Sequence, residues 1–271
     1  MARTSGGVHH VTSPDGTPIA VHRSGRGRPL VLVHGTTATA ARWQAVLPLL
    51  ETHVAPCAVD RRGRGASGDG TAYSLAREAV DVAAVVEAVV ADDAGADGTD
   101  VLGHSYGALV ALEAALLTTR VRRLVLYEPV VTGAASFPSR TEARFEELLA
   151  QGRREDVVVE LLRNLAGVPE EHLALMRADP SWAERVAAAH TVVRETRAES
   201  DYACEPARFA ALRTLTMLLD GTESPDMCRR STALVAAAIP RATVRTLRGQ
   251  GHVAMVSAPD LFVSEVLAFL A

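Results

Sequence analysis

Ser105 lies between Gly103 and Gly107 in the stretch L-G-H-S-Y-G-A, a spacing that can hold a serine hydroxyl on a sharp turn. The apolar residues that end at Leu102 predict a strand, and the alanine-rich stretch from Ala108 predicts a helix. A helix start places backbone N–H groups beside the serine oxygen, where negative charge develops when a hydroxyl attacks a carbonyl carbon. Gly-x-Ser-x-Gly is a weak signal alone, but between a strand and a helix it predicts a nucleophile for acyl transfer.

A serine needs a base to accept its proton, and the chain offers nine histidines for this role. His252, in G-Q-G-H-V-A-M, is predicted to lie on the loop between the last strand and the last helix. That loop and Ser105 fall on the same edge of the predicted sheet, so His252 is the predicted base. His34, which precedes Gly35, is expected to shape a loop near the site and to line a substrate pocket.

Four stretches together resemble the α/β-hydrolase family, and the resemblance runs over nearly the whole chain. They are H-G-T-T from His34, D-R-R-G-R-G-A-S from Asp60, G-H-S-Y-G around Ser105, and G-Q-G-H at His252. In that family two backbone N–H groups hold the oxyanion, one from the residue after the nucleophile and one from the loop after the third strand. The resemblance therefore implies Tyr106 and Thr36 as the oxyanion donors.

The acid that would orient the histidine departs from the pattern that the family commonly shows. Many members carry an aspartate in a G-x-x-D stretch after the insertion, but Ser224 stands at that position in G-T-E-S-P-D. Glu223 and Asp226 flank it, and either could serve if the loop were shifted. Glu128 ends the predicted strand L-V-L-Y-E, a placement that resembles the haloalkane dehalogenase branch, although that branch attacks with aspartate. We predict Glu128 as the acid that orients His252, with Asp226 and Glu223 as alternatives.

Strand and helix patterns alternate along the chain, which predicts a mostly parallel sheet with crossover helices. Two segments around S-P-D-G-T predict an N-terminal antiparallel hairpin, and a helix is expected over 40–50. After Glu128 the alternation stops, and amphipathic stretches without strand patterns continue to about residue 209. The expected architecture is an α/β-hydrolase core over 1–132 and 211–271, with a helical lid over 133–210 inserted after the sixth strand.

Two further features lie near the predicted site. Trp43 begins a predicted helix beside the loop that holds Thr36, and it is expected to line the substrate pocket, although aromatic residues more often pack in cores. Arg61, Arg62 and Arg64 fall in a glycine-rich loop after a predicted strand. A short charge run is usually solvated, so these arginines are expected on the surface, with anion binding as the alternative.

Composition favours a small-molecule partner. The net charge is −4 and the charged residues are scattered, which argues against a nucleic-acid or membrane surface. The three cysteines have no CxxC or metal-ligand pattern, and the absence of lysine excludes Schiff-base chemistry. We therefore expect neither a metal nor a cofactor. The N-terminal residues lack an apolar signal segment, so the expected location is cytoplasmic.

Together these residues predict a serine hydrolase that cleaves a carboxylic ester, lactone or thioester of a small organic acid through an acyl-enzyme. The α/β-hydrolase fold also hosts cofactor-free tailoring reactions, such as acyl transfer, cyclisation and carbon–carbon bond hydrolysis, and some of its members are ligand receptors. A serine, a histidine and an acid in one chain favour turnover over binding alone. The expected partner is a small-molecule acyl substrate, and the expected assembly is a monomer or a homodimer.

Overall fold

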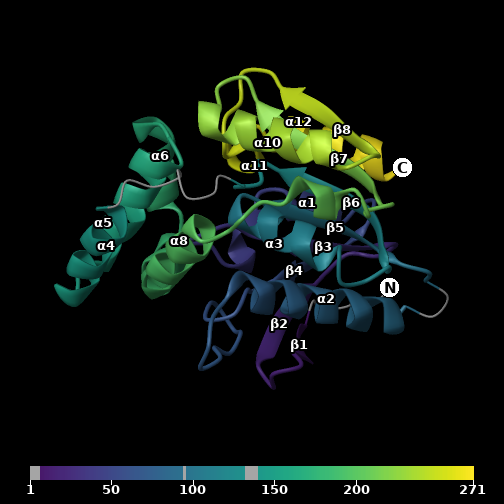
Figure 1. Ribbon diagram of the computed structural model, residues 1–271, viewed down its shortest axis with the longest axis horizontal. Helices are drawn as coiled ribbons and strands as arrows, with labels where there is room; N and C mark the ends of the chain where they lie inside the picture. Colours follow the sequence, from purple (N-terminus) through teal and green to yellow (C-terminus); the bar gives the residue numbers. More distant parts are fainter. Residues whose placement is uncertain (1–6, 94–95, 132–139) are drawn as a thin grey trace.

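The computed structural model of the protein describes residues 7–93, 96–131 and 140–271, and its centre is an eight-stranded sheet (Figure 1). The order of the strands across the sheet is β1-β2-β4-β3-β5-β6-β7-β8. Their bounds are Val8–Thr12 for β1, Pro18–Arg23 for β2, Pro29–Val33 for β3, Ala55–Val59 for β4, Thr99–His104 for β5, Val121–Tyr127 for β6, Leu215–Gly221 for β7 and Ala242–Leu247 for β8.

The sheet is antiparallel only at its N-terminal edge. β1 and β2 form an antiparallel hairpin, and β2 pairs antiparallel with β4. Every other neighbouring pair, from β4–β3 to β7–β8, is parallel. The predicted mostly parallel sheet with an N-terminal hairpin is therefore confirmed. Because parallel strands all point the same way, the carboxyl ends of β3, β5, β6 and β7 meet along one edge.

Both faces of the sheet are covered, as the continuous apolar strand sequences predict. Along β3, Leu30 and Leu32 belong to one hydrophobic core, whereas Val31 and Val33 belong to the other. The first core includes side chains of α1 (Leu47–Leu50) and α12 (Pro259–Leu270). The second includes side chains of α2 (Leu75–Ala91), α3 (Tyr106–Ala114) and α10 (Asp226–Ala238).

A helical insertion, described here over residues 140–209, separates β6 from β7. Its α-helices are α4 (Thr141–Ala150), α5 (Arg154–Glu160), α6 (Glu170–Ala178), α7 (Trp182–Ala187), α8 (Val192–Ser200) and α9 (Pro206–Phe209). A π-helical segment over Leu161–Leu165 and a 3₁₀ segment over Ala188–Thr191 also belong to it. Figure 1 shows α4, α5, α6 and α8 grouped to one side of the sheet. The predicted start of the insertion, residue 133, lies outside the described residues.

The helix predicted over 40–50 is wrong in its continuity. A 3₁₀ turn covers Ala40–Trp43, and α1 begins only at Leu47. Pro48 explains the break, because a proline ring lacks an N–H donor and clashes with the carbonyl four residues earlier in a continuous helix. Within the described part of the chain, none of the helices combines the length and the apolar character that crossing a membrane requires.

Candidate active site

Three strand ends carry strained backbone. Thr37 after β3, Ser105 after β5 and Glu128 after β6 have φ angles of 59°, 56° and 47°. Across the described residues these are the three non-glycine positions in the left-handed region. Such strain persists only where surrounding contacts impose it, and it clusters at functional sites. The carboxyl edge of the sheet is therefore the candidate site, and Thr37 is a residue at this edge that no local sequence pattern identifies.

The turn at Ser105 depends on two close approaches of backbone. Ser105 is the residue before α3, and its N–H donates to the Tyr127 carbonyl at 2.9 Å. A Cβ atom at Gly103 would lie 2.5 Å from the Gly107 carbonyl oxygen, and one at Gly107 would lie 2.3 Å from the His34 carbonyl oxygen. Larger residues at either position would push α3 away from the sheet, which explains the glycine spacing around the serine.

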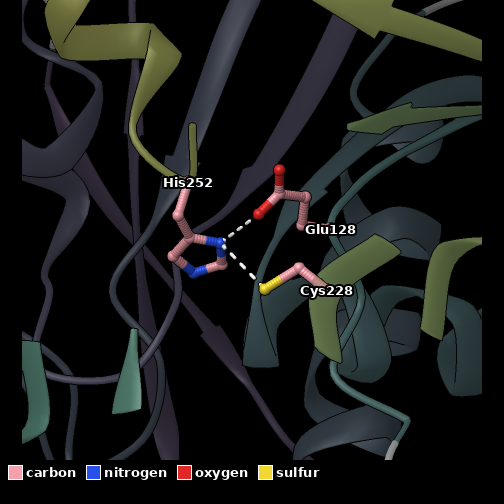
Figure 2. Close-up of side chains that lie close together, drawn as sticks. All are labelled: Glu128, Cys228 and His252. Carbon is pink, nitrogen blue, oxygen red and sulfur yellow. Dashed lines mark hydrogen bonds and ion pairs between the residues drawn. The ribbon is translucent and has the colours of Figure 1, made fainter. Parts of the chain in front are cut away.

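His252 and Glu128 contact each other directly, as Figure 2 shows. The distance from His252 Nδ1 to Glu128 Oε2 is 2.5 Å, and both side chains are buried. Glu128 Oε1 accepts hydrogen bonds from the Ser224 hydroxyl and from the Gly221 N–H, the latter at 3.1 Å. The carboxylate thus has a hydrogen-bond donor on each oxygen, and it lies on the Nδ1 side of the ring, which leaves Nε2 for another partner.

The two alternative acids lie elsewhere. Asp226 begins α10 with 71% of its side chain exposed, and it pairs with Arg229. Glu223 is exposed and accepts a hydrogen bond from Thr222 at 3.1 Å. The structure therefore brings Glu128 to His252 and leaves Asp226 and Glu223 at the surface.

The environment of the His252–Glu128 pair favours opposite charges. Burial by itself would lower the pKa of His252, but the Cys228 sulfur and the Glu128 carboxylate together raise this pKa well above its ordinary value of 6.5. Burial would raise the pKa of Glu128, but hydrogen bonds from His252 and Ser224 hold it below its ordinary value. Cys228 Sγ lies 3.8 Å from His252 Nδ1. No role for this cysteine is predicted from the sequence, because nothing in its local pattern points to the site.

Aromatic residues hold the loop that carries His252. The Tyr127 hydroxyl donates to the Gly251 carbonyl and accepts from the Ala254 N–H at 3.0 Å. His104 Nε2 lies 2.8 Å from the His252 carbonyl oxygen, and the two imidazole rings are 4.7 Å apart at their centroids. Neighbours of Ser105 and Glu128 in the sequence therefore fix the position of His252 from both sides.

Two small adjoining cavities open at Ser105, with volumes of about 50 Å³ and about 30 Å³. Both are lined by Thr36, Ser105, Leu161, Ala166 and His252. The larger one also contacts Glu199 of α8 and Cys228 of α10, and the smaller one contacts Arg42 and Arg185. None of these four was identified from the sequence, because each comes from a segment without a recognisable motif. Between the described atoms of Ser105 and His252 no hydrogen bond is formed, which is common before substrate enters a site.

The two predicted oxyanion residues, Thr36 and Tyr106, lie close to Ser105. Thr36 lines both cavities. Tyr106 is the first residue of α3, where backbone N–H groups have no partner within the helix. Its side chain is buried, and its hydroxyl lies 2.7 Å from the Tyr73 hydroxyl, so only the backbone of Tyr106 is available to the site.

The predicted pocket residues His34 and Trp43 do not line either cavity, and this prediction is corrected. His34 is fully buried, its Nδ1 donates to the Gly35 carbonyl at 2.8 Å, and its Nε2 accepts from the Arg61 N–H at 3.2 Å. Burial and the nearby Arg61 and Arg64 lower its pKa well below 6.5, so the ring is neutral and supports the loop before Thr36. Trp43 packs fully buried in the hydrophobic core, where its large apolar surface is best accommodated.

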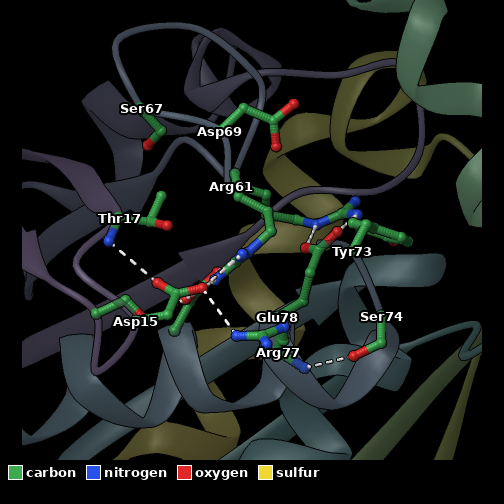
Figure 3. Close-up of polar contacts among 12 residues, drawn as sticks. Asp15, Thr17, Arg61, Ser67, Asp69, Tyr73, Ser74, Arg77 and Glu78 are labelled. Atoms are coloured by element: carbon green, nitrogen blue, oxygen red, sulfur yellow. Dashed lines mark hydrogen bonds and ion pairs between the residues drawn. The ribbon is translucent and has the colours of Figure 1, made fainter. Parts of the chain in front are cut away.

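The expectation that Arg61, Arg62 and Arg64 are solvated is also wrong. All three are at most 2% exposed, and each is paired with a buried carboxylate. Arg61 Nε donates to Glu78 at 2.6 Å, and Figure 3 shows this pair beside Tyr73. The partners of the three arginines are Glu78 and Glu195 for Arg61, Asp15 and Asp81 for Arg62, and Glu78 and Glu195 for Arg64. Because Glu195 lies on α8, Arg61 and Arg64 join the core to the helical insertion.

Within the described residues, one cluster has a metal-ligand composition, and it consists of Glu128, Cys228 and His252. The His252 and Glu128 side chains already bind each other through Nδ1 and Oε2, and both oxygens of Glu128 accept hydrogen bonds. A metal ion would have to replace the direct contact, since it needs the same lone pairs. The donor set therefore fits an oriented imidazole better than a metal centre.

Comparison with known proteins agrees with this architecture. A family model described as "Alpha/beta hydrolase family" matches residues 30–265. The crystal structure of an alpha/beta hydrolase from Sphaerobacter thermophilus is similar, with 36% identity, a TM-score of 0.83, and coverage of 97% of this chain and 100% of that one. A putative carbamate hydrolase from Azorhizobium caulinodans is 26% identical over 90% of this chain and 92% of its own length.

N-formylmaleamate deformylase from Pseudomonas putida is 35% identical over 121 residues. That match spans 43% of each protein, so the chain matches less than half the length of this relative. The family model covers most of the chain. The chain belongs to the alpha/beta hydrolase family and is an enzyme of the hydrolase type.

Proposed function

We propose that this hydrolase cleaves a carboxylic ester, lactone or thioester of a small organic acid through an acyl-enzyme on Ser105. The observation that carries the proposal is the buried contact of 2.5 Å between His252 Nδ1 and Glu128 Oε2, beside a serine on a strained turn. Two relatives are named a carbamate hydrolase and a deformylase, and both names describe attack at a carbonyl carbon. These names support a reaction at a carbonyl carbon, but they do not identify the group that departs from it.

In the first step, Ser105 Oγ attacks the substrate carbonyl carbon while His252 Nε2 accepts the hydroxyl proton. The C–O bond to Ser105 forms, and the carbonyl electrons move onto oxygen to give a tetrahedral oxyanion. His252 then gives the proton to the leaving oxygen or sulfur as that bond breaks. Water repeats the sequence on the acyl-enzyme and releases the acid, with His252 again as base.

The other residues act on charge and orientation. Glu128 holds the Nδ1–H of His252, which keeps Nε2 facing the serine and stabilises the imidazolium that forms. The proposal assigns the oxyanion to the N–H groups of Thr36 and Tyr106, because Thr36 lines the same cavity as Ser105 and Tyr106 begins α3 directly after it. Thr36 follows β3, Tyr106 follows β5 and Glu128 follows β6, so the proposed roles come from residues that follow three neighbouring strands of the sheet.

The helical insertion acts as a lid in this proposal. Leu161, Leu165 and Ala166 of the insertion line the cavities at Ser105, and Glu195 ties α8 to Arg61 and Arg64 of the core. The cavities are small, with a combined volume below about 100 Å³. A substrate must therefore displace part of the insertion on entry, and a small acyl group suits the space that remains.

Intact mass after incubation with a fluorophosphonate tests the nucleophile without knowledge of the substrate. We expect a single adduct on the wild type and none on Ser105→Ala. Ser257→Ala, which changes a serine outside the cavities, is the matched control and should label like the wild type. Absence of an adduct on folded wild-type protein, or an adduct that persists in Ser105→Ala, would contradict the proposal.

A further inference from the structure

Five arginines are buried in the described part of the chain, and two of them have no carboxylate partner. Arg61, Arg62 and Arg64 each contact a carboxylate, as described above. Arg42 and Arg185 are 7% and 5% exposed, yet no described carboxylate oxygen lies within ion-pair distance of either. Residues 1–6, 94–95 and 132–139, which the structure does not describe, contain no aspartate or glutamate.

The contacts that these two side chains do make are weak. Arg185 Nη1 lies 3.4 Å from both the carbonyl and the hydroxyl oxygen of Thr37, and Arg42 Nε is buried without a described hydrogen-bond partner. Asp179 and Glu184 act on Arg185 only from a distance, and their carboxylates accept hydrogen bonds from other residues. The guanidinium of Arg42 adds repulsion to Arg185.

Burial without a counter-charge is unfavourable for both groups. It lowers the pKa of Arg42 to about 10 and lowers the pKa of Arg185 as well. A guanidinium nevertheless keeps its proton near neutral pH, so two positive charges remain in a space with little water. Buried charges of this kind are normally paired, and an anion between them would remove the cost of leaving them unpaired.

The position of the pair places that anion beside the nucleophile. Arg42, from the 3₁₀ turn after β3, and Arg185, from α7, line the smaller cavity together with Thr36, Ser105 and His252. Its volume of about 30 Å³ admits a group of only a few atoms. Planar guanidinium groups match a carboxylate in both charge and shape.

The larger cavity at Ser105 has a different lining. Glu199 lines the larger cavity among apolar side chains, and it is 7% exposed. Burial and the neighbouring Glu195 carboxylate raise the pKa of Glu199 well above its ordinary value, which keeps this acid neutral. An anionic end of a substrate would therefore occupy the smaller cavity, with the arginines, and an apolar or hydrogen-bonding end would occupy the larger cavity, with Glu199.

We propose that Arg42 and Arg185 form a carboxylate-binding subsite, so that the preferred substrates are acyl compounds carrying a carboxylate close to the reacting carbonyl, such as half-esters of short dicarboxylic acids. The carboxylate is placed on the acyl group because that part stays bound through both acylation and deacylation. This inference rests on the proposed function, since it names the substrate class of the same site.

A matched pair of chromogenic esters tests the subsite. The p-nitrophenyl half-ester of glutaric acid carries the carboxylate, and p-nitrophenyl valerate is a neutral ester of similar length. Losing a charge-assisted hydrogen bond costs about tenfold in affinity, so the wild type should favour the half-ester by about tenfold or more in kcat/KM. Arg42→Gln and Arg185→Gln should raise KM for the half-ester by about tenfold each, and each should lose more kcat/KM on the half-ester than on valerate.

Arg153→Gln, which changes an exposed arginine of the insertion, is the control and should leave both esters unchanged. Equal losses on the charged and the neutral ester in the Arg42 and Arg185 variants would overturn the proposal. So would a wild type that hydrolyses valerate as well as the half-ester.

Thermal unfolding of Ser105→Ala gives a second readout that needs no turnover. Glutarate should raise Tm, whereas neutral glutaramide and inorganic phosphate at equal ionic strength should not, and the shift should vanish when Arg42→Gln or Arg185→Gln is added. If those variants fail to fold, the comparison of glutarate with glutaramide and phosphate still decides the outcome. Equal shifts from all three compounds would contradict a carboxylate subsite.

The two proposals fail in different ways. Fluorophosphonate labelling of Ser105 without stabilisation by glutarate would keep the nucleophile and remove the subsite. Stabilisation by glutarate without labelling would keep the subsite and remove the acyl-enzyme.

Discussion

The Ser224 hydroxyl donates a hydrogen bond to Glu128 Oε1, on the carboxylate whose other oxygen contacts His252. Ser224 occupies the position where many family members carry the acid, and Glu128 comes from the end of the neighbouring strand. β6 and β7 are adjacent in the sheet, so residues that follow either strand converge on the same imidazole. The serine thus supports an acid that projects from the other strand.

Replacing Glu128 with glutamine should damage activity far more than replacing either alternative acid. Glu128→Gln removes the charge that stabilises the imidazolium and puts an amide against Nδ1, so kcat should fall by about a thousandfold or more. Asp226→Asn and Glu223→Gln, at exposed positions, should change kcat by less than about twofold. Steady-state hydrolysis of p-nitrophenyl esters measures this, and comparable activity of Glu128→Gln and wild type would contradict the assignment.

Because residues after β6 and after β7 both lie close to His252, we predict that a carboxylate at position 224 can replace the one at position 128. In Glu128→Ala the His252 ring loses its carboxylate, and adding Ser224→Asp should return one to the same side of the ring. We expect the double variant to exceed Glu128→Ala by about tenfold in kcat. Ser224→Asp alone should lower activity, because two adjacent carboxylates repel and one of them takes up a proton. A double variant no better than Glu128→Ala would show that β7 cannot supply the acid here.

Much of the fold and of the candidate site follows from local sequence. The glycine spacing around Ser105 and the G-Q-G-H stretch identify the residues that the structure brings to one edge, because a parallel sheet collects its strand ends there. The choice of Glu128 over Asp226 also followed from its place directly after an apolar strand. These are short-range signals, since each depends on residues within one strand or turn.

Other members of the site depend on contacts between distant segments. Arg61 looks like part of a solvated charge run, but its partner Glu195 is 134 residues away and decides its burial. Arg42 and Arg185 meet across 143 positions, with no motif around either. His34 was misplaced for the same reason, because its partner Arg61 comes from the loop after the next strand in the chain. Local sequence patterns cannot identify such pairs, because the two partners lie far apart in the chain and no motif marks their contact.

The contact between His252 and Glu128 also predicts the pH dependence. Only neutral imidazole can accept the Ser105 proton, so activity is lost as the pH falls through the pKa of His252. The neighbours of His252 raise this pKa above 6.5, so the acid limb of kcat/KM should lie above pH 6.5. Glu128→Gln should move the limb to lower pH, because the partner of the charged form is gone. Cys228→Ala should move it in the same direction by less, since a thiol bonds only weakly. A wild-type limb below pH 6.5, or one that stays in place in Glu128→Gln, would contradict this account.

Glu195 and Glu199 offer a matched test of the connection between the insertion and the core. Both are buried on α8, but Glu195 contacts Arg61 and Arg64, whereas Glu199 is held neutral by burial. Glu195→Gln leaves two buried guanidiniums short of a counter-charge, and the free energy of unfolding should fall by about 3 kcal/mol. Glu199→Gln replaces a neutral acid with a neutral amide of the same shape, so its effect should stay below about 1 kcal/mol. Urea unfolding at neutral pH measures both, and equal losses in the two variants would mean that the charge on Glu195 does not hold the insertion in place.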